Sequence, residues 1–293
     1  MALDTAEQRS SLRIRLFGGL QLLAFGRALR FAAPPKAASL LAYLIVHRAQ
    51  PASRDGIAFT FWPDDDETRA RANLRRHIAL ILRALPARAA QPILADNRSI
   101  QWNPLYPCTI DVAEFEQLSH DADGAADATA VYAGDLLPDA YDEWILPERE
   151  RLRSMHSTNL ERLTESYANA GDYARAIATT RTLLLHDPWR EDAVRTLLSL
   201  RHAAGDRAGA LQEYERFAER LQRDLDAAPM PETVSLYESI RSGPSSTAGD
   251  RPASALERAV APATMPFVGR GEELLRLRQM WVRTMRGLGG VAV

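Results

Sequence analysis

The stretch Glu67–Leu85, ETRARANLRRHIALILRAL, decides how the rest of this 293-residue chain is interpreted. Its apolar residues recur at steps of four, three and four, a spacing that predicts one buried face of an α-helix: Leu74, Ile78, Ile81 and Leu85. Between Glu67 and Arg88 there are six arginines and one glutamate, whereas the whole chain carries a net charge of −2. We therefore expect a basic, outward-facing helix, capped in the D-x-x-E manner by Asp64 and ended by Pro86.

Short elements are expected on both sides of this helix. Residues 12–31, LRIRLFGGLQLLAFGRALRF, alternate apolar and polar positions around glycine turns, which predicts short antiparallel strands. Pro35 opens a helix that ends near His47, and Ser53 is a favourable cap for a second helix from Arg54 to Phe61. Residues 92–102, PILADNRSIQW, predict a β-hairpin with a polar tip.

Three helices, of which the last is basic, followed by a hairpin is the order of a winged helix-turn-helix domain. The strings LRIRLFGGLQL, SRDGIAFTFWP and RANLRRHIALILRAL cover most of residues 12–103. Together they resemble the OmpR-type winged helix that opens SARP-type regulators, and we assign this domain to residues 11–105, after a flexible tail at 1–10. The second half of the basic helix departs from the family, because Ala79, Leu80 and Leu82 stand where members often carry Ser or Arg. Leu80, expected to be exposed, would contact a thymine methyl group or a protein partner.

The candidate DNA-binding residues lie on the outward face and flanks of the basic helix, at the starts of the two preceding helices and at the hairpin tip. They are Lys36, Arg54, Arg69, Arg71, Asn73, Arg75, Arg76, His77, Arg83, Asn97 and Arg98. The alternative for Lys36, Arg54, Asn97 and Arg98 is that they are ordinary surface residues, and His77 could pack instead of contacting a phosphate. The acidic run from Asp64 to Glu67 lacks the spacing of a calcium loop, so helix capping is the better interpretation.

The second half of the chain is acidic at first and then repetitive. Residues 109–150 hold twelve Asp or Glu and one Arg. Further on, Ala170-Gly171-Asp172 recurs as Ala204-Gly205-Asp206, and Ala174 and Ala176 recur as Ala208 and Ala210. The period of 34 residues is that of the tetratricopeptide repeat (TPR), in which glycine makes the turn, aspartate caps the next helix and small alanines allow close packing. Helices near 149–169 and 228–240 should complete the array.

The string YAGDLLPDAYDEWILPERERL, Tyr132–Leu152, does not follow this period. It resembles the signature of the bacterial transcriptional activator domain, which follows the winged helix in SARP-type proteins, and we assign this domain to residues 109–241. An enzyme with paired carboxylates is the alternative for the acidic residues Asp139, Asp142, Glu143, Glu148 and Glu150, but no histidine or hydroxyl partner accompanies them. Trp144 and Trp189 are expected to anchor the packing between helices.

The C-terminal end is expected to be a linker, residues 242–263, followed at 264–293 by the truncated start of another domain. MPFVGRGEELLRLRQMW, Met265–Trp281, resembles the lead-in of AAA-like or STAND ATPases. The phosphate loop G-x-x-x-x-G-K-[ST] does not occur in the sequence. We therefore expect an N-terminal fragment of a larger regulator, with no cofactor in this chain and ATP bound only by the missing part.

These observations predict a mainly α protein with a small β part: a winged helix followed by an all-α, TPR-like domain. One cysteine and the absence of a signal peptide or an apolar run of about 18 residues favour a cytoplasmic protein without membrane contact. The resemblance implies a non-enzymatic activator that binds direct repeats in double-stranded promoter DNA as a homodimer and recruits RNA polymerase to the genes of a secondary-metabolite pathway. The alternative is a TPR-type signalling scaffold or sensor whose winged helix binds protein.

Overall fold

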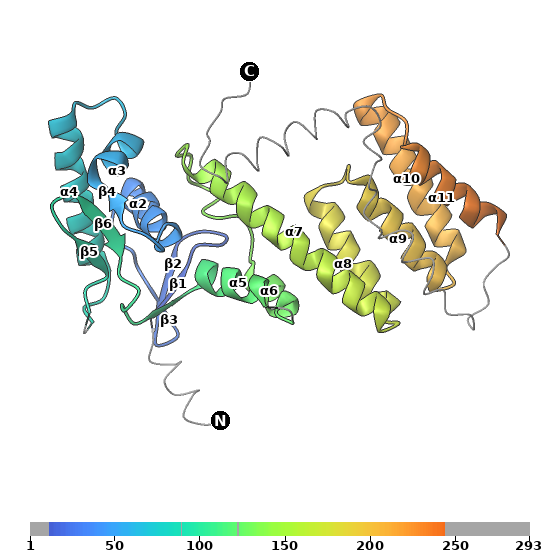
Figure 1. Ribbon diagram of the computed structural model, residues 1–293, viewed down its shortest axis with the longest axis horizontal. Coiled ribbons are helices and arrows are strands. Elements are labelled where there is room, and N and C mark those ends of the chain that lie inside the picture. Colours follow the sequence, from blue (N-terminus) through green and yellow to red (C-terminus); the bar gives the residue numbers. More distant parts are fainter. Residues whose placement is uncertain (1–11, 89, 122, 244–293) are drawn as a thin grey trace, which may run out of the picture.

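The computed structural model describes residues 12–88, 90–121 and 123–243, which form an elongated molecule (Figure 1). Strands and short helices up to Trp102 occupy one end, and paired helices occupy the other. The predicted fold class, mainly α with a small β part, is confirmed. Of the predicted linker, residues 242–263, Ser242 still belongs to the last helix, and residues 244–263 lie outside the described residues, as do the ATPase-like segment at 264–293 and the tail.

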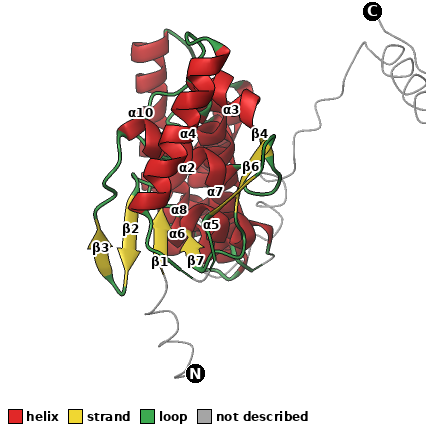
Figure 2. Cartoon of the chain, turned by 90° about the vertical axis from the view of Figure 1, so that its left-hand side faces the viewer, coloured by secondary structure: helices red, strands yellow, loops and turns green. Residues whose placement is uncertain are grey.

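A four-stranded sheet lies at the base of the first domain. Figure 2 shows its strands side by side in the order β3 (Arg27–Leu29), β2 (Gln21–Ala24), β1 (Leu12–Arg15) and β7 (Cys108–Ile110). The three predicted strands pair antiparallel, and the turn between β2 and β3 places Phe25 and Gly26 at positive φ. The sequence did not indicate β7, which pairs parallel to β1 and comes after the winged helix in the chain.

The three predicted helices follow as α2 (Pro35–Val46), α3 (Arg54–Phe61) and α4 (Glu67–Ala84). The hydroxyl of Ser53 caps α3 as predicted, by accepting from the amide of Gly56. The capping prediction for α4 was wrong by two residues, because Asp66 and not Asp64 accepts the amide of Arg69, at 3.0 Å. The aspartate that directly precedes the first helical residue has the extended backbone that a cap needs.

The predicted hairpin consists of β5 (Ile93–Ala95) and β6 (Ser99–Trp102). A two-residue strand, β4 (Ala52–Ser53), pairs with β6 and extends the hairpin to three strands. This pairing ties the start of α3 to the wing, since Ser53 is both a strand residue and the helix cap.

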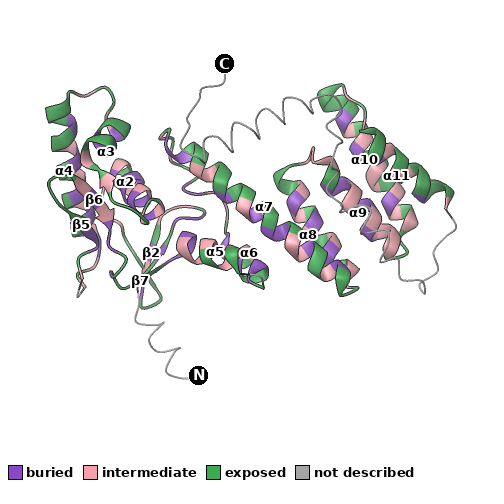
Figure 3. Cartoon of the chain, viewed as in Figure 1, coloured by how far each residue is buried: buried purple, intermediate pink, exposed green. Residues whose placement is uncertain are grey.

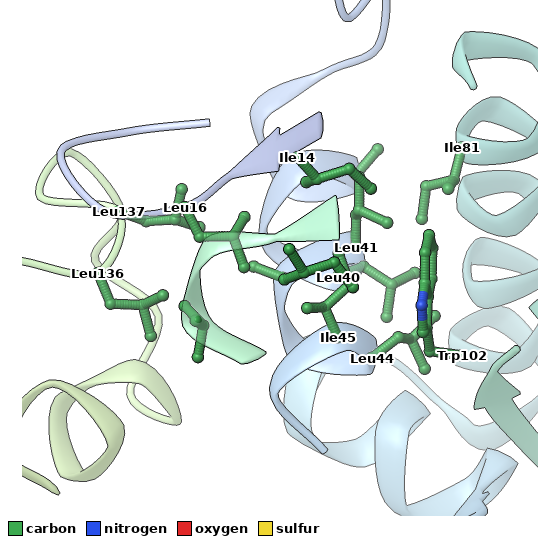
Figure 4. Packing of buried hydrophobic residues seen from close by; sticks show 14 of the residues in the cluster. Ile14, Leu16, Leu40, Leu41, Leu44, Ile45, Ile81, Trp102, Leu136 and Leu137 are labelled. Atoms are coloured by element: carbon green, nitrogen blue, oxygen red, sulfur yellow. The ribbon is translucent and has the colours of Figure 1, made fainter. Parts of the chain in front are cut away.

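The activator domain begins with α5 (Asp111–His120), α6 (Ala125–Val131) and the long α7 (Ile145–Asn169). These elements do not form a separate core, because one cluster of buried apolar residues runs from Leu12 to Leu152. Figure 4 shows Leu136 and Leu137, from the segment before α7, next to Leu16, and the α2 leucines belong to the same cluster. The winged helix and the start of the activator domain therefore fold around shared apolar residues.

The predicted repeat is present in the structure as two helix pairs. Helix α7 turns into α8 (Tyr173–His186) at Gly171, and α9 (Glu191–Ala203) turns into α10 (Arg207–Leu225) at Gly205, both glycines having positive φ. Asp172 and Asp206 cap the helices that follow. Helix α11 (Pro231–Ser242) packs on α9 and α10 and completes the array.

The alanines of the repeat do not all behave as predicted. Ala176 and Ala210 are buried at equivalent places, with exposed fractions of 0% and 1%. Ala174 and Ala208 are exposed, so the prediction that they let helices approach closely was wrong. Residues two positions apart in an α-helix are rotated by about 200° around its axis. Ala174 therefore lies on a different side of its helix from Ala176, and Ala208 on a different side from Ala210.

Candidate nucleic-acid interface

Helix α4 presents the basic face that its sequence predicts. Figure 3 shows it as largely exposed, and its buried residues, Ala70, Leu74, Ile78 and Ile81, lie on the side that packs against α2 and α3. Arg75, Arg76 and Arg83 are exposed, and none of them makes an ion pair or hydrogen bond with another residue of the described part of the chain. Three guanidinium groups are thus available to an external partner along one helix.

Arg71, by contrast, is held within the protein. Its Nε and Nη2 donate to the two oxygens of Asp55 on α3, at 2.7 and 2.9 Å, and Nη2 also lies 2.7 Å from Glu67. The hydrogen bond from Arg71 lowers the pKa of Asp55 below its usual value. The sequence placed Arg71 on the flank of the helix but could not show this bidentate pair, which joins residues 16 positions apart.

Three further predicted site residues hold the turn between α3 and α4. Asn73 donates from Nδ2 to Asp65 at 2.8 Å, and the Nε of Arg69 lies 3.3 Å from the same carboxylate. Nδ1 of His77 lies 2.8 Å from the carbonyl oxygen of Asn73, and its ring lies 5.0 Å from that of Trp62. His77 is half-buried, so the packing interpretation describes its position. Arg69 remains mostly exposed and can still reach outward.

The wing presents its tip beside α4. Asp96 accepts from the amides of Arg98 and Ser99, each at 2.7 Å, and these hydrogen bonds lower the pKa of its carboxyl group. Arg54 donates from Nε to the carbonyl oxygen of Asp96 at 2.7 Å, so that this predicted site residue braces the tip from the start of α3. Asn97 and Arg98 are exposed at the tip.

A groove of about 640 Å³ runs between α4 and the wing. Its lining contains four arginines and two aspartates among nine residues: Ser53, Arg54, Asp55, Arg71, Leu74, Arg75, Asp96, Asn97 and Arg98. The structure therefore brings five of the predicted residues together: Arg54, Arg71, Arg75, Asn97 and Arg98. Sequence reasoning missed Asp55 and Asp96 as members of this groove. The D-N-R-S tip was a usable signal for Asp96, whereas nothing in the sequence pairs Asp55 with Arg71.

Lys36 is not part of the groove. Its ammonium group lies 2.9 Å from Asp142 of the activator domain. Leu80 was expected to be exposed and is half-buried, whereas Leu82 is 38% exposed. Leu80 directly precedes the buried Ile81, and its side chain is partly covered.

Three of the acidic residues considered for an enzyme lie in ion pairs: Asp142 with Lys36, Glu148 with Arg151, and Glu150 with Arg153. In residues 12–88, 90–121 and 123–243, no group of three or more His, Cys, Asp or Glu side chains could hold a metal ion. None of the helices described is long and apolar enough to cross a membrane. Trp144 and Trp189 pack between elements as predicted.

The fold and the basic groove define a class: a winged-helix domain joined to a helical-repeat domain. Residues 110–241 match the bacterial transcriptional activator domain family. The chain is 23% identical over 306 residues to the regulatory protein AfsR of Streptomyces griseus, a match that covers 95% of this chain and 30% of that protein. The chain thus spans about a third of the length of this relative.

A solved structure shares the fold. It is that of Mycobacterium tuberculosis EmbR in complex with a low-affinity phosphopeptide, with a TM-score of 0.63 and 23% identity, covering 85% of this chain and 69% of that one. The comparisons thus show a match to the bacterial transcriptional activator domain over residues 110–241, a similarity to a regulatory protein and a fold shared with EmbR.

Proposed function

We propose that the chain binds double-stranded promoter DNA through α4 and the wing, and that it activates transcription without being an enzyme. The observation that carries this proposal is the set of exposed, unpaired guanidinium groups of Arg75, Arg76 and Arg83 on the described part of α4. Arginine pairs with guanine in the major groove and with phosphates, and a helix of this kind fits the groove.

The wing supplies the second part of the interface. Arg98 and Asn97 at its tip would contact the backbone or the neighbouring groove, and Arg54 would hold the tip in position. Arg69, Arg71, Asn73 and His77 would support α4 or contact phosphates beside it. In this proposal the chain binds direct repeats as a homodimer and works in the cytoplasm, and the activator domain recruits RNA polymerase at promoters of a secondary-metabolite pathway.

The experiment is a DNA titration of wild type and Arg76→Ala at several salt concentrations. The specific site is first selected from random duplex DNA, and a scrambled duplex serves for comparison. Arg76→Ala should weaken specific binding by about 1–3 kcal/mol if Arg76 pairs with a guanine, or should reduce the salt slope by about one if it contacts a phosphate. Arg216→Ala on α10 removes an exposed arginine far from the groove and is the control.

A wild-type protein without salt-dependent binding to any duplex would overturn the proposal. The scaffold interpretation would then stand in its place, and the exposed Leu82 would be the first residue to test on a protein partner. If Arg76→Ala and Arg216→Ala lost equal DNA affinity, Arg76 would make no specific contribution, and the DNA-binding surface would not lie on α4.

A further inference from the structure

The first turns of α2 meet the segment that precedes α7 through a chain of hydrogen bonds. Asp142 accepts from the ammonium group of Lys36 at 2.9 Å and from the hydroxyl of Ser39. Ser39 in turn accepts from the indole Nε1 of Trp144 at 3.1 Å. Ser39 and Trp144 are buried, with exposed fractions of 3% and 9%. We call these four residues the clasp: Lys36, Ser39, Asp142 and Trp144.

The clasp acts on the two helices that support α4. The ring of Trp144 lies 5.2 Å from that of Tyr43 on α2 and 6.3 Å from that of Phe61 on α3. Tyr43 and Phe61 also contact each other edge to face, at 5.5 Å. Both α2 and α3 pack against α4. Activator-domain residues therefore reach the supports of α4, while none of the residues that line the groove belongs to the clasp.

Two residues of the clasp are buried, Ser39 and Trp144, and its ion pair is partly withdrawn from water, with side-chain exposed fractions of 38% for Lys36 and 19% for Asp142. A carboxylate that is half-withdrawn from water is stabilised only while its donors stay in place, and removing one partner leaves the other poorly solvated. Close packing transmits a displacement of α2 to α4, because interiors have few voids that could absorb it.

We propose that Asp142 and Trp144 are positioning residues for DNA binding: through the clasp, the activator domain sets the orientation of α4 and thereby the specific affinity of the winged helix. This inference rests on the proposed DNA binding. It assigns Lys36 to the clasp and not to a phosphate. Bidentate base contacts depend on the orientation of α4, whereas contacts to phosphates tolerate small rotations. Loss of the clasp should therefore reduce specific binding and leave non-specific binding unchanged.

The test is a titration of Asp142→Asn and Lys36→Met, in the full chain, on selected and scrambled duplexes at several salt concentrations. Measurements are made well below the melting temperature, with the active fraction determined by stoichiometric titration, so that lower stability alone does not alter the result. Each variant should lose roughly fivefold or more in specific affinity. Affinity for scrambled DNA and the salt slope should stay as in wild type.

Two further variants sharpen the test. Glu143→Gln changes the exposed neighbouring carboxylate, which has no ion pair in the described part of the chain, and should bind as wild type. The exchange Lys36→Asp with Asp142→Lys rebuilds the ion pair in reverse and should recover part of the lost specific affinity.

Three results would overturn the inference. Wild-type specific affinity in Asp142→Asn would show that the clasp does not affect α4. A salt slope reduced by about one in Lys36→Met, with scrambled DNA weakened equally, would show that Lys36 contacts a phosphate. A wild-type protein that binds no duplex would instead remove the proposed function itself, which the same titrations detect before any variant is compared.

Discussion

The carboxylate of Asp111 accepts a hydrogen bond from the backbone amide of Leu16 at 2.8 Å, although the two residues are 95 positions apart. The same oxygen accepts from the amide of Phe17 at 2.9 Å. Asp111 is buried, and burial raises the pKa of its carboxyl group in spite of these donors. Asp111, the first residue of α5, thus accepts hydrogen bonds from the two backbone amides that follow β1. The strand just before it, β7, pairs with β1, so the start of the activator domain completes the sheet of the winged helix.

Replacing this carboxylate should destabilise the whole first half of the chain. Asp111→Ala leaves the amides of Leu16 and Phe17 buried without an acceptor, and each such loss costs about 1–3 kcal/mol. We expect the free energy of unfolding, measured in urea by fluorescence of the tryptophans, to fall by about 2–5 kcal/mol. Glu165→Ala, an exposed position on α7, is the control and should change it little. Equal stability of the two variants would show that water satisfies these amides.

The repeat makes a prediction with a control on the same helix. Ala210 is buried between helices and Ala208 is exposed. Ala210→Leu should overpack the contact and lower the free energy of unfolding by about 1–3 kcal/mol, whereas Ala208→Leu should leave it nearly unchanged. Thermal melts followed by circular dichroism compare the two. If Ala208→Leu were the more destabilised variant, the orientation of α10 in the array would be wrong.

Local patterns allowed most elements of the fold to be predicted. The four-three-four spacing placed α4, Ser53 placed the start of α3, and the recurrence of Ala-Gly-Asp placed both turns of the repeat. Each of these signals acts within a few residues of its effect. The pairing of β7 with β1 joins segments about 95 positions apart, and no local pattern specifies which strand a three-residue segment will join.

The candidate site was predictable in its location but not in its internal contacts. The basic composition of α4 and the polar wing tip indicated two of the elements that line the groove. Whether an arginine is free or paired depends on side chains brought in from other elements, as Asp55 is for Arg71 and Asp142 is for Lys36. Sequence alone therefore placed Lys36, Arg71 and Arg76 among the candidates, while the structure shows that Lys36 and Arg71 are paired with carboxylates and that Arg76 is unpaired among the described residues.

A buried histidine should make the stability depend on pH. His156 on α7 stacks on Tyr132, with ring centroids 4.1 Å apart, and His186 approaches edge-on at 5.4 Å. Burial, assisted by His186, lowers the pKa of His156 from 6.5 to about 4. Between these values the unfolded chain binds a proton that the folded protein does not, so the free energy of unfolding falls as the pH falls. Above pH 6.5 this residue contributes no pH dependence.

The measurement is urea unfolding of wild type and His156→Phe between pH 7.5 and 4.5. Phenylalanine keeps an aromatic ring against Tyr132 and cannot be protonated. The difference in free energy of unfolding between the two proteins should shift in favour of the variant on acidification, by up to about 3 kcal/mol. Subtracting the free energy of unfolding of the variant from that of wild type at each pH removes the contribution of the carboxylates that both proteins share. Parallel pH profiles would show that His156 is protonated in the folded protein as easily as in the unfolded one.

The pairing of Asp55 with Arg71 predicts a gain of DNA binding on mutation. Both groups lie at the groove, and Arg71 is bound to Asp55 through two hydrogen bonds. Asp55→Ala removes a negative charge that faces the DNA in the proposed complex and leaves Arg71 with Glu67 as its one ion-pair partner among the described residues. Affinity for scrambled DNA should rise, and the slope of log K against log salt should become steeper by about one, since one more guanidinium group reaches a phosphate.

The matched control is Glu232→Ala, which removes an acidic residue from the first turn of α11, far from the groove. It changes the net charge of the chain by the same amount, so it isolates the effect of position from that of total charge. If both variants bind scrambled DNA equally well, the gain comes from net charge. If Asp55→Ala binds more weakly than wild type, the ion pair itself holds Arg71 in its DNA-contacting position, and Arg71 would then belong with the supports of α4.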